Sequence, residues 1–154
     1  MSETNTIQNI VTDIKNISTR PSWNEYFMTM SYLISKRSTC SKLQVGCVII
    51  KNNRVISTGY NGHIASTDHI SIIRDNHEMA TLHAEMNAVC DSSKRGVSIL
   101  DSIVYVSHFP CLNCTKILIA AGVKEIIYGE DYSNDEIAYT LLKSANVNIT
   151  KFKF

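Results

Sequence analysis

Four side chains of this sequence have types and spacings that could do chemistry. His83 and Glu85 flank one alanine in the segment TLHAEMNAV, and Cys111 and Cys114 stand three residues apart in HFPCLNC. Each pair is predicted at the start of a helix, where the partial positive charge of the N-terminus favours thiolates over thiols. One imidazole and two thiolates can hold a tetrahedral zinc ion whose fourth position stays open for water. The sequence therefore predicts a zinc site of the catalytic kind.

Glu85 is predicted to move protons rather than to bind the metal. It stands two residues after His83, roughly 200° around a regular helix, so it is badly placed to reach the same ion but could sit over the bound water. Either motif alone is weak, because His-x-Glu occurs by chance and a lone Cys-x-x-Cys could be redox-active or simply buried. Together, with proline before the first cysteine, they match the pattern of zinc-dependent nucleobase deaminases. That pattern predicts that water attacks C4 of a cytosine ring, Glu85 carries its proton to N3, and ammonia leaves.

Composition limits both the class of protein and the class of ligand. The 154 residues are 44% hydrophobic and 19% charged, which is typical of one globular domain. A formal net charge of +1 offers no overall field to a polyanion, so we expect a small ligand and no nucleic-acid partner. No membrane association is expected, because no apolar run could span a bilayer and the N-terminus lacks a secretory signal. We expect a cytoplasmic protein, in the host cytosol if it is viral, whose five cysteines serve metal binding or burial.

The elements that must position these residues follow from the apolar periodicity, which indicates an α/β fold. Helices are predicted over 22–37, around 81–94, and over 111–121 and 134–144, and strands over 45–50, after a turn at Asn52 and Asn53, and over 102–107, 125–129 and 147–152. The polar stretch 62–77 is expected to be a loop. The late alternation of strand and helix predicts parallel strands that are covered on both faces.

The first 20 residues are a separate feature. Five aliphatic side chains recur there at helical spacing before Pro21 interrupts the pattern, namely Ile7, Ile10, Val11, Ile14 and Ile17. We expect residues 1–20 to form an amphipathic helical extension and residues 21–154 to form the deaminase domain. The apolar stripe needs a surface to cover it, either the body of this chain or another subunit.

From about Trp23 to the C-terminus the sequence resembles the deoxycytidylate (dCMP) deaminases of the cytidine deaminase superfamily. The likeness runs through KRSTCSKLQVGCVI, GYNG, HAEMNAV, FPCLNCTKILIAAGVKEIIYG and DYSNDE. The pair GYNG and FPCxxC is the discriminating part, since deaminases of tRNA, free bases and the riboflavin pathway share only the zinc motifs. The resemblance implies a three-layer α/β/α fold with a five-stranded mixed sheet, and deamination of dCMP to dUMP for thymidylate synthesis. It also implies that His83, Cys111 and Cys114 hold one zinc ion and that Glu85 is the proton shuttle.

The same resemblance suggests which residues bind the substrate. Asn61 matches a position that contacts the sugar in relatives, and Tyr60 is expected to shape the pocket, whereas an ordinary Asn-Gly turn is the alternative. His108 and Tyr132 follow strands, at the edge where ligands gather in such sheets, and the alternative for His108 is a strand-end histidine with an ordinary hydrogen bond. The phosphate needs a cation, for which Lys36, Arg37, Lys42 and Arg74 are candidates, although each could be a solvated surface charge. The set predicted to bind substrate is Arg37, Tyr60, Asn61, Ala84, His108, Pro110 and Tyr132.

One departure from the family pattern bears on regulation. Many members follow GYNG with one residue and then proline, whereas this chain continues with HIAS. In the family, dCTP activates and dTTP inhibits near this segment, commonly with Mg²⁺ and in a hexamer. The resemblance therefore implies a homo-oligomer, a hexamer, with dCTP and dTTP as candidate effectors and Mg²⁺ as a candidate second ion. The altered segment leaves open whether this chain has kept that regulation.

Three classes of function remain open from the sequence. A nucleotide deaminase acting on dCMP, or on both dCMP and dCTP, fits the full set of motifs and the near-neutral charge. A tRNA or DNA deaminase would share the zinc residues but is expected to show a basic face or a base-stacking loop, and the sequence offers no obvious one. A scaffold that keeps zinc without turnover is disfavoured by Glu85, because zinc binding alone gives no reason for that carboxylate.

Overall fold

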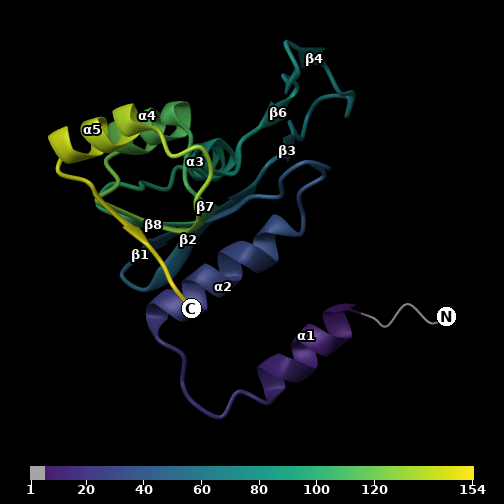
Figure 1. Cartoon of the computed structure of the whole chain (residues 1–154), viewed down its shortest axis with the longest axis vertical. Helices are drawn as coiled ribbons and strands as arrows, with labels where there is room; N and C mark the ends of the chain where they lie inside the picture. Colours follow the sequence, from purple (N-terminus) through teal and green to yellow (C-terminus); the bar gives the residue numbers. More distant parts are fainter. Residues whose placement is uncertain (1–5) are drawn as a thin grey trace.

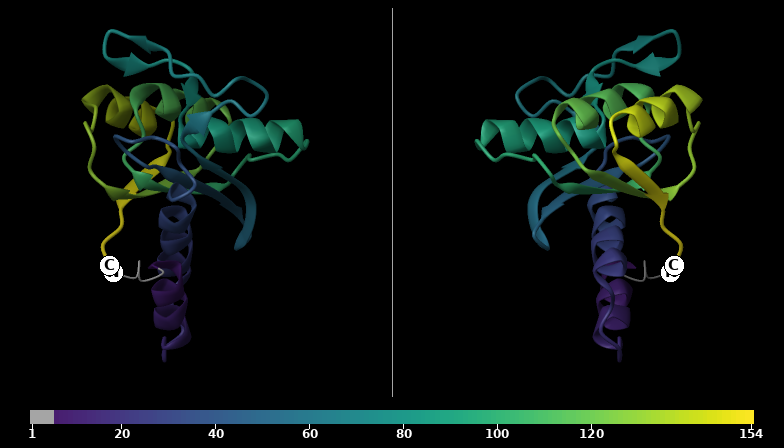
Figure 2. Two further views of the ribbon diagram at one scale, coloured as in Figure 1. Left: turned by 90° about the vertical axis from the view of Figure 1, so that its right-hand side faces the viewer. Right: turned by 90° about the vertical axis from the view of Figure 1, so that its left-hand side faces the viewer.

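Three layers make up the body of the molecule, with one sheet between two layers of helices (Figure 1). The structure is a computed structural model that describes residues 6–154. Helix α2 covers one face of the sheet, and α3, α4 and α5 cover the other (Figures 1 and 2). This arrangement confirms the expected α/β/α fold. The helices are α1 (Thr6–Lys15), α2 (Trp23–Ser35), α3 (Ala84–Lys94), α4 (Leu112–Ala120) and α5 (Glu136–Ser144), and the strands of the main sheet are β1 (Gly46–Lys51), β2 (Arg54–Tyr60), β7 (Ile103–His108), β8 (Glu125–Glu130) and β9 (Asn148–Lys151).

The five-stranded sheet is mixed, as expected, with the order β2-β1-β7-β8-β9. Strand β1 runs antiparallel to β2 and β7, and β8 runs parallel to β7 and β9. The turn between β1 and β2 uses Asn52 and Asn53 at φ values of 51° and 57°, which asparagine tolerates and a tight hairpin requires. Because β7 and β8 are parallel neighbours, their carboxyl ends meet at one edge, where His108 pairs with Glu130. The residues that follow these two strands therefore share this edge.

The sheet separates two apolar cores that follow from the alternation of side chains along β1. Val48 and Ile50 face α2 and pack with Phe27, Met28, Tyr105 and Ile127. Cys47 and Ile49 face the opposite side and pack with Val104, Val106, Leu118, Ile126 and Leu142. Each aliphatic side chain buried in this way contributes about 1.5–3 kcal/mol to the free energy of unfolding. The two cores fix the helices on both faces of the central strands.

Two glycines let helices lie directly on the sheet. A Cβ atom on Gly46 would stand 2.0 Å from the Ser31 carbonyl oxygen of α2, and one on Gly59 would stand 2.2 Å from the Ala84 carbonyl oxygen of α3. No side chain fits into either gap. Since Ala84 lies between His83 and Glu85, Gly59 sets how closely this turn approaches β2.

The segment between β2 and α3 forms an arm, and two sequence expectations for it are wrong. Within the expected loop and just after it lie four short strands, β3 (Gly62–His63), β4 (Ile73–Arg74), β5 (His77–Glu78) and β6 (Thr81–Leu82). Strand β3 pairs with β6, and β4 pairs with β5 (Figure 2). Strands of two residues are too short to show an alternating pattern in sequence. The pairing of Gly62 with Leu82 also keeps Thr81 extended, so α3 begins at Ala84 rather than near Thr81.

The N-terminal apolar stripe lies on helix α1, within the region expected to be helical. No residue of α1 is buried, and residues 16–22, which link it to α2, are exposed as well. Residues 1–5 of the expected extension lie outside the described residues. Over residues 6–154, no helix is both long enough and apolar enough to cross a membrane.

Candidate active site and metal centre

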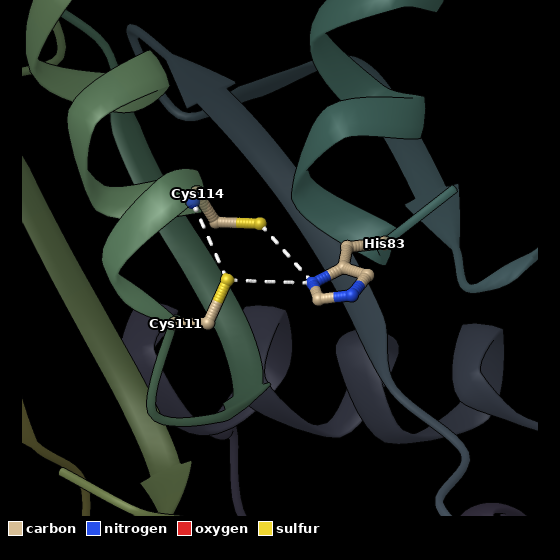
Figure 3. Close-up of side chains that lie close together, drawn as sticks. All are labelled: His83, Cys111 and Cys114. Carbon is tan, nitrogen blue, oxygen red and sulfur yellow. Dashed lines mark hydrogen bonds between the residues drawn. The ribbon is translucent and has the colours of Figure 1, made fainter. Parts of the chain in front are cut away.

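His83, Cys111 and Cys114 converge between the starts of α3 and α4 (Figure 3). His83 Nδ1 lies 3.4 Å from Cys111 Sγ and 3.5 Å from Cys114 Sγ, and the candidate ligand atoms all lie within 4.8 Å of one another. Within residues 6–154, no other group of three or more His, Cys, Asp or Glu side chains is arranged to hold a metal. The fold therefore brings together the three residues that the sequence named as ligands.

Local backbone structure aims these side chains at one another. His83 is the N-cap residue of α3, with extended dihedrals of φ −71° and ψ 157°, and its side chain makes no capping hydrogen bond. The imidazole is therefore free to turn toward α4. Cys111 is the N-cap residue of α4, and its Sγ accepts a hydrogen bond from the Cys114 backbone N–H at 3.5 Å. One turn of helix thus places both sulfurs on the same side.

The three side chains fit a zinc ion in both chemistry and spacing. With Zn–S near 2.3 Å and Zn–N near 2.0 Å, the sulfur and nitrogen ligands of a tetrahedral site stand about 3.5 Å apart. The separations between His83 Nδ1 and the two sulfurs agree with that value. A hydrogen bond from the Cys114 thiol, with a smaller effect of His83, lowers the pKa of Cys111 to about 4. Cys111 is therefore a thiolate at neutral pH and ready to bind a cation.

Glu85 lies in the first turn of α3 and is 4% exposed. Burial raises the pKa of its carboxyl above the ordinary value, and the Cys114 thiol and His83 imidazole are close enough to influence it. A carboxyl with a raised pKa accepts a proton more readily at neutral pH than an exposed glutamate does. Its position beside the ligand cluster suits a group that takes up and releases protons.

The Tyr60–Asn61 pair lies where β2 ends, and its contacts are mostly with the backbone. Asn61 Oδ1 accepts from the Val45 N–H and its Nδ2 donates to the Leu43 carbonyl, both at 2.8 Å. The chain passes from β2 directly into β3, and Asn61 has no positive φ, so no tight Asn-Gly hairpin turn forms here. Asn61 therefore ties residues 43–45 to the end of β2, and one amide hydrogen remains for a ligand.

His108 and Tyr132 face each other at the carboxyl edge of the sheet. Their ring centroids are 6.4 Å apart with an interplanar angle of 86°, and His108 Nδ1 lies 2.9 Å from Ser107 Oγ. Burial lowers the pKa of the His108 imidazole below its ordinary value. Tyr132 is 54% exposed and projects at the rim. His108 therefore stands on the segment that leads into the cysteines, and Tyr132 meets it from the loop that follows β8.

The other predicted substrate-binding residues differ in exposure. Pro110 is fully buried and accepts a 3.4 Å hydrogen bond from Thr115 Oγ1, so it shapes the turn into α4. Ala84 is fully buried under Gly59. Arg37 is exposed just beyond the end of α2, where its backbone N–H donates to the Ile34 carbonyl. The structure thus groups His108, Pro110 and Tyr132, while Arg37 stands on a different element.

Two residues that support the site were not predicted from the sequence. Asn87 Nδ2 donates to the Tyr60 carbonyl at 2.9 Å and so joins α3 to the end of β2. Its position four residues after His83, on the same face of α3, was the available signal. Asn134 Oδ1 accepts from the Tyr132 N–H at 3.0 Å, and its Nδ2 donates to Asp131 at 2.8 Å. No periodicity in the sequence marks a contact of that kind.

Comparison with known protein families shows to which family a chain with this site belongs. The family model for the cytidine and deoxycytidylate deaminase zinc-binding region matches residues 21–130, a range that contains His83, Glu85 and both cysteines. The chain belongs to this family. The membership expected from the motifs is thereby confirmed, and the family description, together with the convergence of His83, Cys111 and Cys114, supports a bound Zn²⁺ ion.

Individual relatives agree with the family assignment. The chain is 43% identical over 134 residues to ComE operon protein 2 of Bacillus subtilis, covering 84% of this chain and 71% of that protein. It is 34% identical over 167 residues to the deoxycytidylate deaminase of Saccharomyces cerevisiae, covering 96% of this chain and 53% of that one. The chain therefore spans about half the length of the yeast relative. The dCMP deaminase of cyanophage S-TIM5, solved in complex with dCMP and dUMP, is 29% identical with a TM-score of 0.78, covering 87% of this chain and 99% of that one.

Proposed function

We propose that this chain hydrolyses dCMP to dUMP and ammonia, and thereby supplies dUMP for thymidylate synthesis. The observation that carries the proposal is the convergence of His83, Cys111 and Cys114 beside the buried carboxyl of Glu85. Membership of the deaminase family and the likeness to named dCMP deaminases support the choice of reaction and substrate.

In this proposal each residue of the cluster has one task. His83, Cys111 and Cys114 hold the zinc ion, which when bound acidifies a water molecule. Glu85 takes a proton from the water that adds to C4 of the cytosine ring and delivers it to N3. Glu85 then moves the remaining hydroxyl proton to the amino group, the C4–N4 bond breaks, and ammonia leaves with dUMP as the product. The raised pKa of Glu85 supports this two-way transfer.

We propose that the substrate lies between the end of β2 and the carboxyl edge of β7 and β8. Tyr60 and Asn61 would meet the sugar, while Ala84 and Pro110 shape the buried end of the pocket. His108 and Tyr132 would border the nucleotide, and their ring contact beside Pro110 supports this placement. Arg37 would reach the phosphate from the end of α2.

Further parts of the proposal concern the whole chain. Residues 21–154 would form the deaminase domain, and residues 1–20 would form an extension outside it, which the lack of any buried residue in helix α1 supports. We infer a cytoplasmic homo-oligomer, a hexamer by analogy with the family. Regulation by dCTP and dTTP with Mg²⁺ rests on family resemblance alone and stays a prediction.

The test is ammonia release by the purified, zinc-loaded chain from dCMP, dCTP, deoxycytidine, cytidine and an adenosine-containing tRNA hairpin, with Glu85→Ala as the blank. We expect kcat/KM for dCMP to exceed that for both nucleosides, because the phosphate adds binding energy. Comparable turnover of dCTP would widen the function to both nucleotides. Turnover of the hairpin alone, or of no substrate even with dCTP and Mg²⁺ added as activators, would overturn the proposal.

A further inference from the structure

Helix α1 carries an apolar stripe that no part of residues 6–154 buries. Ile7, Ile10, Val11 and Ile14 follow the spacing of one helical face, and Ile17 continues it just beyond the helix. Ile7, Ile14 and Ile17 are each more than half exposed. A helix of 10 residues is marginal on its own in water, so packing of this stripe would add most of its stability.

Helix α2 carries a second uncovered apolar stripe on the side that faces away from the sheet. Its members are Trp23, Tyr26 and Leu33, which lie three and seven residues apart along one helical face, whereas Met30 between them packs against the core. Trp23 and Tyr26 are about half exposed, and so is Leu33. Trp23 stacks on the buried Phe27 at a centroid distance of 5.4 Å, so the start of this stripe is anchored on the core.

We propose that these stripes form one interface between two copies of this chain, in which α1 of each copy packs on the α2 stripe of the other. Both stripes belong to the same chain, so a two-fold axis would satisfy both of them in both copies at once. Ile10 and Ile14 of one copy would lie against Tyr26 and Leu33 of the other. The exchange leaves neither apolar face in water.

The area available matches what a dimer needs. At about 100 Å² for each half-exposed aliphatic or aromatic side chain, the two stripes offer on the order of 800 Å² per copy, which is the contribution of one partner to an interface of standard size. A single copy could in principle cover itself, since residues 16–22 are long enough for an αα-hairpin. The fold does not take that option, because every residue of α1 is exposed and α1 stands apart from the body (Figure 1).

The interface is separate from the proposed active site. Helix α2 covers one face of the sheet, whereas His83, Cys111 and Cys114 lie at the starts of α3 and α4 on the other face (Figure 1). The inference therefore does not rest on the proposed reaction, and the two can fail independently.

The first experiment compares the self-association of full-length, zinc-loaded variants by sedimentation equilibrium. Ile10→Asp with Ile14→Asp introduces two carboxylates into the α1 stripe, and Tyr26→Lys with Leu33→Lys introduces two amines into the α2 stripe. Asn9→Asp with Thr12→Asp is the matched control, because it places two carboxylates on the opposite face of α1. We expect each stripe variant to raise the Kd of self-association by about 100-fold or more, and the control to leave it within about threefold.

A mixing experiment distinguishes exchange between copies from folding back within one copy. The α1-stripe variant keeps an intact α2 stripe, and the α2-stripe variant keeps an intact α1 stripe. When the two variants are mixed, only a dimer with one copy of each can pack an intact α1 stripe on an intact α2 stripe. We expect the mixture to associate more tightly than either variant alone, with zinc content and circular dichroism unchanged in all variants. A wild-type chain that stays monomeric at tens of micromolar, stripe variants that associate like the control, or a mixture that shows no rescue would each overturn the proposal.

Discussion

At the scale of single residues, the carboxyl of Glu85 is the group whose loss should separate catalysis from structure. Glu85→Gln keeps the shape of the side chain but removes its ability to accept a proton. We expect dCMP turnover to fall by about 10²–10⁴-fold, the usual contribution of general acid–base catalysis, while one zinc ion per chain is retained. Ammonia release and elemental analysis of the purified variant measure the two effects.

A matched control for that change exists in α5. Glu136 also lies in the first turn of a helix but is exposed and outside the ligand cluster, so Glu136→Gln should keep full turnover. If Glu85→Gln kept more than a tenth of wild-type turnover, the proton-transfer role proposed for Glu85 would be wrong.

The two sulfurs should decide metal retention. Cys114→Ser replaces a fully buried thiol at the cluster with a harder and weaker zinc ligand. We expect the affinity for zinc to fall by more than about 100-fold, since changes in the groups that merely orient metal ligands already cost 10–100-fold. Competition with a chromogenic chelator measures this affinity. Cys90→Ser, which changes an exposed cysteine of α3, should leave it unaltered, and equal losses in the two variants would contradict the assignment.

Sequence reasoning could single out His83, Glu85, Cys111 and Cys114 as candidates because each stands at or just after a helix start, where a short motif fixes the direction of the side chain. It could not foresee how far the Asn61 amide is engaged. Its bonds to Leu43 and Val45 join segments about 16–18 residues apart, and nothing in GYNG itself records them. The same holds for Asn134, whose bond to the Tyr132 backbone depends on the conformation of one loop.

At the scale of elements, the contact between β2 and α3 should be intolerant of added volume. The methyl group of Gly59→Ala would stand 2.2 Å from the Ala84 carbonyl oxygen and 2.5 Å from the Ala88 nitrogen. Because both atoms belong to the backbone of α3, the helix must move, and we expect a loss of about 3 kcal/mol or more in the free energy of unfolding. Urea unfolding of the zinc-loaded protein measures that loss, and zinc affinity should fall with it.

Gly96→Asn is the control for Gly59→Ala. Gly96 has a φ of 66°, a conformation that asparagine tolerates, and within residues 6–154 no atom beyond its own chain neighbours lies within 4 Å of the position that its Cβ would take. We expect it to change stability by about 1 kcal/mol or less. A stable, zinc-replete Gly59→Ala variant would show that the approach of α3 to β2 does not position the site.

Helices and long strands were predictable, whereas the arm was not. Strands β1, β7 and β8 of the main sheet bury runs of mostly apolar residues and so leave a clear pattern, while β3 and β6 are defined by the pairing of two residues each with partners about 20 positions away. That long-range pairing also sets the start of α3. The predicted helix from Thr81 failed for this reason, although His83 itself still stands at the helix start.

At the scale of the whole molecule, the near-neutral net charge should make substrate binding only weakly dependent on salt concentration. We expect kcat/KM for dCMP to change by less than about tenfold between 50 and 200 mM salt, because a protein that binds 6–10 phosphates of a nucleic acid would lose about 10³–10⁵ in affinity over that range. Initial rates across a salt series measure this dependence. A steep decline would point instead to an extended polyanionic substrate.

The layered fold was predictable from the alternation of elements and the family likeness, but the placement of α1 was not. The stripe of α1 requires a covering surface, and the sequence alone left open which surface that is. Only the exposure of both α1 and the outer face of α2 indicates that two uncovered surfaces exist on one chain.

The metal cluster also joins distant parts of the chain. His83 is 28 residues from Cys111 and 31 from Cys114, with all of α3 and β7 between them, so an ion held there closes a loop that the unfolded chain would otherwise leave open. Zinc would then act on folding as well as on chemistry. Bound zinc should add about 2.7 kcal/mol to the free energy of unfolding when free zinc is at 100 times its Kd. The melting temperature should therefore rise with the logarithm of the free zinc concentration. In a cell starved of zinc, the amount of this protein would therefore decline along with its specific activity, because unfolded chains are degraded.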